Sequence, residues 1–172
     1  MCEQINKNFK IRFAQAADNK LILELIKELA GYEKLLAEVV ATEEILYDSL
    51  FVKKQAEVII GEYLGEPVAF ALFFHNFSTF LGKAGIYLED LYIRPEVRGK
   101  GLGKLMLAYL AELAIKRNCG RLEWWCLDWN KNSLEFYYQM GAKAMDEWTV
   151  YRLSGEKLAE LAEKYRVNYK ND

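Results

Sequence analysis

The sequence predicts an α/β protein of the α+β type, with helices packed on a mostly antiparallel sheet. The 172 residues are 52% apolar and 14% aromatic, which is enough to bury one sizeable core. Strand-like and helix-like hydrophobic patterns follow one another in a mixed order. Because no internal repeat or long linker interrupts this order, we expect a single domain over residues 1–172.

The first half of the chain is expected to hold a strand, two helices and a hairpin. Their signals are period-two alternation for strands, apolar residues at helical spacing, and cap or turn residues at the ends. The expected elements are a strand over Phe9–Ala14, a helix from Ala17 to Gly31, a short helix capped by Thr42 and running to Leu50, and strands over Ala56–Tyr63 and Val68–Phe74 around the turn Gly65-Glu66-Pro67.

The second half is expected to alternate between strands and helices and to end in a frayed polar tail. The expected elements are a strand over Ala84–Ile93, a helix over Gly101–Cys119, a buried strand over Arg121–Trp129, a helix capped by Asn132-Ser133 and stopped by Gly141, a strand over Trp148–Leu153, a helix capped by Ser154, and the tail Arg166–Asp172.

Composition excludes several classes of function. The net charge of -2 provides no positive field for a nucleic-acid backbone, so we expect no nucleic-acid partner. Three cysteines (Cys2, Cys119 and Cys126) and one histidine (His75) form no zinc or disulfide pattern. The N-terminus lacks a signal-peptide core, and no apolar run approaches the ~20 residues of a membrane helix. We therefore expect a cytoplasmic protein without a metal, a membrane partner or a histidine-based nucleophile.

A glycine-rich segment between a strand and a long helix carries the strongest chemical signal. Residues 98–104 read Arg-Gly-Lys-Gly-Leu-Gly-Lys. The free amides and dipole at a helix N-terminus favour an anion, and glycines let a pyrophosphate approach the backbone. The spacing matches neither the P-loop nor the dinucleotide fingerprint. The segment predicts a phosphate site of another kind, with a simple tight turn as the alternative.

The segment from Leu88 to Gly103, LEDLYIRPEVRGKGLG, resembles the signature loop of the GNAT superfamily of acyl-CoA-dependent N-acyltransferases. Further matches resemble its diamine (spermidine/spermine) N-acetyltransferase branch: IKELA from Ile26 with Tyr32-Glu33, and Trp129-Asn130 with Ser133, Phe136-Tyr137 and Gly141-Ala142. The resemblance implies helices on both faces of the sheet and a splayed central pair of strands, 84–93 and 121–129, with acetyl-CoA between them.

The resemblance also implies residues that hold acetyl-CoA. Leu91 and Ile93 would offer backbone hydrogen bonds to the acetyl and pantetheine arms, and the glycine segment would bind the pyrophosphate. The full set of implied cofactor-binding residues is Leu91, Tyr92, Ile93, Arg98, Gly99, Lys100, Gly101, Leu102, Gly103, Lys104, Asn130, Lys131, Asn132, Ser133 and Tyr137.

Amine attack on a thioester needs a base for the ammonium and an acid for the leaving thiolate. We expect Glu89 to be the base, although either Glu89 or Asp90 could instead face solvent in the strand alternation. By its match to the family's tyrosine, Tyr137 is the expected acid, with an aromatic core stripe as its alternative. Cys126 lies in an apolar run and is expected to be a buried hydrophobe.

A small cationic amine (a polyamine, a diamine or a lysine-like amine) is the expected acceptor. Tyr32, Glu33 and Glu89 are the expected substrate-binding residues, and acidic side chains at Glu28, Glu38, Glu43, Glu44 and Asp128 would add to an attractive field, unless they are ordinary solvated carboxylates. Glu123 and Phe80 replace a histidine and a tryptophan of the polyamine-acetylating members, which puts the shape of the amine pocket in question.

Members of the branch are usually homodimers, so we expect a homodimer here. Two alternatives to the expected function stay open. One is an acyltransferase that acts on a protein, peptide or amino-acid amine. The other is a module that binds acyl-CoA without turnover.

Overall fold

The computed structural model describes residues 7–169, and for residues 168 and 169 only the backbone. Cys2 and the last three residues of the expected polar tail lie outside this part. The chain divides between Asn130 and Lys131 into two compact units, which are described separately below.

The first unit is built on a five-stranded sheet in the order β1-β2-β3-β4-β5. The strands span Phe9–Phe13, Glu57–Tyr63, Glu66–Ser78, Lys83–Ile93 and Leu122–Trp124. Strands β1 to β4 are antiparallel to their neighbours, whereas β5 runs parallel to β4. The mixed, mostly antiparallel sheet predicted from the sequence is confirmed.

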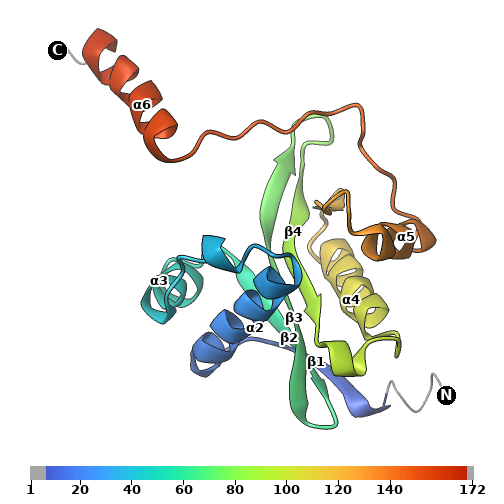
Figure 1. Ribbon diagram of the computed structural model, residues 1–172. Coiled ribbons are helices and arrows are strands. Elements are labelled where there is room, and N and C mark those ends of the chain that lie inside the picture. Colours follow the sequence, from blue (N-terminus) through green and yellow to red (C-terminus); the bar gives the residue numbers. More distant parts are fainter. Residues whose placement is uncertain (1–6, 170–172) are drawn as a thin grey trace. The chain divides into compact units, whose positions relative to one another are not determined.

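Helices cover both faces of this sheet (Figure 1). On one face α2 (Asn19–Tyr32) packs on β2, β3 and β4, and on the other lies α4 (Leu102–Lys116). The core under α2 contains Ile22, Leu25, Leu50, Val58, Ile60, Phe70 and Tyr92, and α4 buries Leu102, Met106 and Leu110. This apolar burial is the main source of stability for the unit.

Short helical turns connect these elements. They are η1 (Ala16–Asp18), η2 (Leu36–Glu38), α3 (Glu43–Tyr47), the π-helix η3 (Asp48–Val52) and η4 (Pro95–Val97). The Thr42 hydroxyl accepts a hydrogen bond from the Ile45 amide at 3.3 Å, which confirms the predicted cap of α3.

One extra residue interrupts the ladder between β3 and β4. The register passes from Leu72 opposite Asp90 to Phe73 opposite Leu88, so Glu89 has no partner of its own. This is a β-bulge, which bends a strand and redirects its side chains.

The bulge changes which neighbouring strand the backbone amides of β4 face. The Ile86 amide donates toward β5, whereas the Arg94 amide donates toward β3. In a regular strand, residues separated by an even number would point their amides to the same edge. The shift means that Leu91 and Ile93 direct their backbone groups away from β3.

Within the second unit, α5 (Lys131–Gln139) and α6 (Gly155–Tyr169) are the helices of the described residues. The predicted strand over Trp148–Leu153 is wrong, because these residues adopt no strand. Their side chains are exposed, and a strand needs a neighbour to satisfy its backbone. Helix α6 continues through Tyr169, so the predicted fraying from residue 166 is wrong up to that point.

Some predicted boundaries in the first unit also differ. The strand predicted over 121–129 covers only Leu122–Trp124, because β5 is the edge strand and leaves β4 after three paired residues. The hairpin turn is Leu64-Gly65, both with positive φ as a two-residue turn requires, so Pro67 lies inside β3. Helix α2 passes Gly31 and ends at Tyr32, and α4 ends at Lys116.

Candidate active site

Strand β4 has an open edge along its second half. It pairs with β5 only from Ile86 to Leu88, yet continues to Ile93. Past Leu88, β5 is absent from that edge, and the bulge at Glu89 turns the backbone of Leu91 and Ile93 toward it. The predicted splay between the two strands is therefore present, and it leaves the backbone of Leu91 and Ile93 without a β5 partner beside the carboxyl end of β4.

The glycine segment lies between this open edge and α4. Gly99 and Gly101 have φ values of 76° and 78°, a region that favours glycine, and Gly101 is the N-cap of α4 without a side-chain cap. Leu102, Gly103 and Lys104 form the first turn of the helix, where amides have no partner within the helix. These amides and the helix dipole suit an anionic group.

The two basic side chains before the helix lie against aromatic rings. The Arg98 guanidinium is 4.7 Å from the centre of the Tyr32 ring and 5.6 Å from that of Tyr92, and its Nε donates to the Ile93 carbonyl at 2.8 Å. The Lys100 ammonium is 5.3 Å from the Tyr63 ring centre. Cation–π contacts of this kind hold the charges beside the glycine segment.

Tyr32, at the end of α2, connects this segment to the chain that follows β5. Its hydroxyl donates to Asn130 Oδ1 at 3.3 Å, and its ring centre lies 6.2 Å from that of Trp129. Asn130 is buried, although it precedes the second unit by one residue. Two residues predicted for the site, Tyr32 and Asn130, are thus in direct contact.

Three carboxyl groups gather on the α2 side of the open edge. Burial, followed by the charges of Glu89 and Glu33, raises the pKa of Asp90 to about 7. Burial also raises the pKa of Glu33. Glu89 itself is exposed on the bulge. The predicted residues Glu33 and Glu89 are therefore close enough to Asp90 to share one electrostatic environment.

Sequence reasoning missed the importance of Asp90. The available signal was the adjacent Glu-Asp pair in an apolar strand, from which period-two alternation predicts that one residue faces away. The bulge breaks this alternation, so Glu89 and Asp90 can both direct their side chains to the same face of the sheet.

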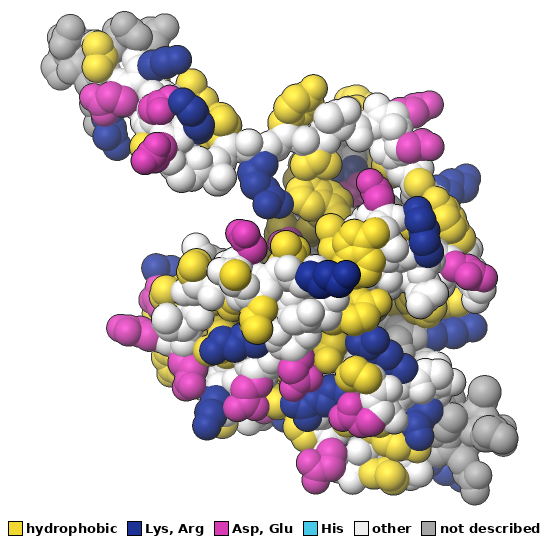
Figure 2. Space-filling model, in the orientation of Figure 1, with side chains coloured by type: hydrophobic (Ala, Val, Ile, Leu, Met, Phe, Trp, Pro, Cys, Tyr) yellow, Lys and Arg dark blue, Asp and Glu magenta, His cyan; other side chains and the backbone are white. Residues whose placement is uncertain are grey.

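The other acidic residues of the predicted field have different surroundings. Glu28 accepts three hydrogen bonds from Arg94 at 2.7–3.2 Å, so its charge is already neutralised. Glu38, Glu43 and Glu44 are exposed on η2 and α3. Figure 2 shows acidic and basic side chains interspersed over the face that it draws. Of the predicted acidic residues, Glu33, Glu89 and the exposed Asp128 therefore remain near the open edge, together with Asp90.

The remaining predicted residues lie on α5, in the second unit. Lys131, Asn132 and Ser133 form its first turn, and Tyr137 lies one turn further on. Tyr137 is half-buried, and its ring packs against Phe136 with centres 5.2 Å apart. This ring contact joins neighbouring residues of α5, a helix that has no buried residue.

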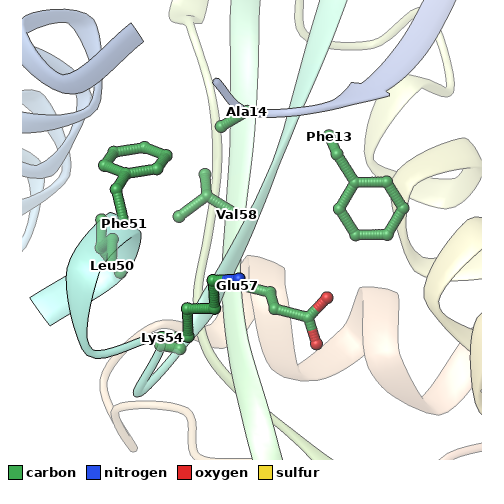
Figure 3. Close-up of a pocket in the computed structure, with 8 residues that line it drawn as sticks. Phe13, Ala14, Leu50, Phe51, Lys54, Glu57 and Val58 are labelled. Atoms are coloured by element: carbon green, nitrogen blue, oxygen red, sulfur yellow. The ribbon is translucent and has the colours of Figure 1, made fainter. Parts of the chain in front are cut away.

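A hollow of about 370 Å³ lies elsewhere in the first unit, where β1 ends and β2 begins (Figure 3). Its walls are apolar apart from Lys54 and Glu57, and in the close-up Phe13 and Phe51 lie on opposite sides of Val58. Hydrogen bonds from Arg117 lower the pKa of Glu57. This carboxylate is therefore already paired and offers no acid–base group.

Cysteine and metal chemistry find no support in the described residues. Burial, with the nearby charges of Glu33 and Asp128, raises the pKa of the Cys126 thiol, which disfavours a thiolate nucleophile. Among residues 7–169, no group of three or more His, Cys, Asp or Glu side chains could hold a metal ion. Within the same range, no helix has the length and apolar character needed to cross a bilayer.

Comparison with known proteins connects this geometry to a family. The family model described as "Acetyltransferase (GNAT) family" matches residues 20–142, which include the open edge, the glycine segment and Tyr137. The chain belongs to the GNAT acetyltransferase family. It is therefore an acyltransferase with acetyl-CoA as the acetyl donor.

Relatives of this GNAT protein include N-acetyltransferases that are named for the small amine they acetylate. A thialysine N-epsilon-acetyltransferase of Bos taurus is 39% identical over 166 residues, covering 90% of this chain and 97% of the relative. An L-ornithine N5-acetyltransferase of Arabidopsis thaliana is 32% identical, covering 88% of this chain and 87% of the relative. Among solved structures, an integron cassette protein of V. cholerae has a TM-score of 0.77 at 26% identity, covering 91% of this chain and 98% of that one.

The residues of the GNAT chain fit acetyl-CoA. The open edge at Leu91 and Ile93 offers peptide groups of the kind that an amide-containing arm pairs with. The first turn of α4 offers free amides, with Arg98 and Lys100 nearby, and this arrangement suits a pyrophosphate.

Proposed function

We propose that this GNAT protein transfers the acetyl group of acetyl-CoA to the primary amine of a small cationic acceptor, by direct attack of the amine on the thioester. The observation that carries the proposal is the group of carboxyls formed by Glu33, Glu89 and Asp90 beside the open edge at Leu91. A cationic amine is attracted to these charges and is thereby brought next to the acetyl group.

We assign the binding of acetyl-CoA to the open edge and the glycine segment. Leu91 and Ile93 bind the acetyl and pantetheine arms through their backbone, beside Tyr92. The amides and charges of residues 98–104 bind the pyrophosphate. Asn130, Lys131, Asn132 and Ser133 border the pantetheine arm. Two observations support this assignment. The bulge turns the backbone of Leu91 and Ile93 away from β3, and the amides in the first turn of α4 have no partner within the helix.

The acceptor must lose a proton before it can attack. A primary ammonium with a pKa near 10.4 is almost fully charged at neutral pH. We propose that Glu89 takes this proton, directly or through a water, and that Asp90 assists by holding the ammonium once it is ionised. Because the pKa of Asp90 is about 7, its charge changes within the neutral range.

The chemical step needs no covalent enzyme intermediate, because the amine attacks the thioester directly. The amine nitrogen forms a bond to the acetyl carbon, the carbon–sulfur bond breaks, and the Leu91 amide polarises the carbonyl. We propose that Tyr137 protonates the departing thiolate. A Tyr137→Phe variant tests this role, since it should lower kcat while leaving the affinity for acetyl-CoA unchanged.

The acceptor class rests on charge, on size and on relatives. Tyr32 and Glu33 lie at the end of α2, and Glu33 is close to Asp90. Together with Glu89, they are the proposed substrate-binding residues. The relatives named above act on thialysine and ornithine, both small amines with an amino-acid head. We propose an acceptor of this size, with polyamines and diamines as the wider class.

The test is acetyl-CoA-dependent thiol release with a panel of amines: thialysine, lysine, ornithine, putrescine, spermidine and lysine-containing peptides. Turnover with free small amines is the expected result. Turnover with peptides alone would replace the proposed acceptor by a protein or peptide. Binding of acetyl-CoA without turnover on any amine would indicate a module that binds acyl-CoA without catalysis.

We also propose that the enzyme is a cytoplasmic homodimer. Three cysteines without a CxxC pair are typical of a reducing compartment. The second unit exposes an apolar series that a partner subunit can cover: Trp148, Val150, Tyr151, Leu153, Leu158, Leu161 and Tyr165. A concentration-independent monomer mass in analytical ultracentrifugation would contradict the dimer.

A further inference from the structure

A mixed-charge cluster lies at the start of β5, outside the residues assigned above. Glu123 Oε2 accepts a hydrogen bond from Asn76 Nδ2 at 2.7 Å and lies 2.7 Å from Arg121 Nε. The side chains of Arg121 and Glu123 are about one third exposed, at 35% and 34%. We call Asn76, Arg121 and Glu123 the head-group cluster.

The head-group cluster lies on the same face of the sheet as the carboxyls of the proposed amine site. Asn76 and Leu72 are four residues apart in β3 and therefore face the same side. Asp90 is opposite Leu72, and Glu123 bonds to Asn76. A ligand on this face can reach both groups without crossing the sheet.

Aromatic rings separate the two polar groups. The Tyr87 ring packs between Phe74, with centres 5.1 Å apart, and Trp125, at 5.8 Å. Trp125 is 55% exposed. These rings provide an apolar wall between the two polar ends, which suits an aliphatic or thioether chain.

The spacing suits a basic amino acid. Glu123 is in register with Tyr87 on the neighbouring strand. Because of the bulge, Tyr87 and Asp90 lie opposite Phe74 and Leu72, which are two residues apart in β3. The two carboxyl positions are therefore about 7 Å apart along the strands and about 4.8 Å apart across them, roughly 8 Å in all. Six single bonds separate the two nitrogens of lysine, a span of about 7–8 Å when extended. A lysine chain that lies along this face therefore places one nitrogen within hydrogen-bonding reach of each carboxyl position.

Two buried polar atoms of the head-group cluster have no hydrogen-bond partner. Asn76 Oδ1 and Arg121 Nε are buried and make no hydrogen bond, although Nε lies close to Glu123. A Cβ atom at Gly85 would collide with Asn76 Oδ1 and would come within 2.8 Å of Arg121 Cγ. The glycine in β4 is what allows these side chains to lie over the strand.

We infer that the head-group cluster binds the α-amino and α-carboxylate groups of a basic amino-acid acceptor, whose side-chain amine lies at Glu89 and Asp90. Arg121 binds the carboxylate, and Glu123 accepts from the α-ammonium. A polyamine would place a second ammonium beside Arg121, which like-charge repulsion disfavours. This inference rests on the proposed function and adds the feature that selects amino acids over polyamines.

The test compares acceptors that differ only in the carboxylate: lysine with cadaverine, and ornithine with putrescine. The wild-type enzyme should have a kcat/KM for lysine about 10-fold or more above that for cadaverine, since a charge-assisted hydrogen bond contributes at least one such factor. Lysine methyl ester, which lacks the negative charge, should resemble cadaverine. Equal kcat/KM values for the three would overturn the inference, whereas no turnover on any of them would overturn the proposed function instead.

Variants then locate the preference. Arg121→Gln should reduce the lysine-to-cadaverine ratio of kcat/KM about 10-fold, chiefly through the KM for lysine. Glu123→Gln should lower kcat/KM for lysine and cadaverine alike, because both carry an ammonium at that end. Because both acceptors are measured with the same enzyme preparation, the ratio of their kcat/KM values does not depend on the fraction of the protein that is correctly folded. Arg117→Gln is the matched control, because Arg117 also pairs with a glutamate, Glu57, elsewhere in the first unit. If the lysine-to-cadaverine ratio were unchanged in Arg121→Gln, or reduced equally in Arg117→Gln, the head-group cluster would not recognise the acceptor carboxylate.

Discussion

The two edges of β4 differ in how completely the backbone is paired. Toward β1, β2 and β3, the closed side, the ladder runs from Lys83 to Ile93 with one bulge, and Phe70 and Phe73 are fully buried. Toward β5, the open side, pairing lasts only three residues. Stability is therefore expected to come from the closed side, whereas the unpaired backbone of the open side is available to a ligand.

The largest expected effect is on the closed side. Phe70→Ala removes a fully buried ring from the core under α2 and should lower the free energy of unfolding by about 3–5 kcal/mol. Trp129→Ala, on the open side, removes a ring that is 50% exposed and should cost less than about 1 kcal/mol. Urea denaturation followed by circular dichroism measures both. Equal losses would contradict the comparison.

The next effect concerns catalysis on the open side. Glu89→Gln should lower kcat at least about 100-fold at neutral pH, because the proposed base for the acceptor ammonium is lost. The defect should shrink as the pH approaches the pKa of the amine, where neutral acceptor becomes abundant. Steady-state rates between pH 6 and 10 measure this. A defect that does not depend on pH would remove Glu89 from proton transfer.

Two glycines with similar φ values, Gly65 and Gly101, make it possible to distinguish backbone strain from an effect on ligand binding. Gly101→Val and Gly65→Val each place a β-branched residue at positive φ, 78° and 88°, and each should cost about 1–3 kcal/mol of stability. Only Gly101→Val should also weaken acetyl-CoA binding, by about 10-fold or more, measured by calorimetry. Weaker binding in Gly65→Val as well would attribute the loss to general destabilisation.

The smallest expected effect is in the pH profile of Asp90→Asn. With a pKa of about 7, Asp90 is mostly neutral at pH 6 and mostly ionised at pH 8. The variant should therefore resemble the wild type at pH 6 and should lose a rise in acceptor kcat/KM of about tenfold between pH 6 and pH 8. The ratio of wild type to variant at each pH isolates this from titration of the acceptor.

Glu33→Gln sharpens the assignment of that titration. The charge of Glu33 contributes to the raised pKa of Asp90, so its removal should shift the midpoint of the rise to lower pH. A midpoint that does not move would mean that another group is titrating.

The closed side was largely predictable from the sequence, since its strands and the helix α2 follow local hydrophobic patterns. The glycine segment was also predictable, because Gly99 and Gly101 lie immediately before a helical pattern. Features that depend on distant partners were not. The apolar residues after Trp124 favoured a long strand, but a strand persists only where a neighbour pairs with it.

The site shows the same division. Tyr32, Glu33, Glu89 and Asn130 were identified from the resemblance to the family, and the structure brings them to the open side. The contact of Asn76 with Glu123 joins residues 47 positions apart and has no local signal. The pairing of Glu28 with Arg94, over 66 positions, likewise removes a carboxylate that the sequence alone counted as free.

The bulge at Glu89 makes the length of β4 as important as its composition. Deleting one residue there would restore regular alternation and would turn the peptide groups of Leu91 and Ile93 back toward β3. The chain would keep nearly every side chain of the site and would lose the backbone groups that we propose to bind acetyl-CoA. Insertions and deletions within β4 should therefore be tolerated far less than substitutions at the same positions.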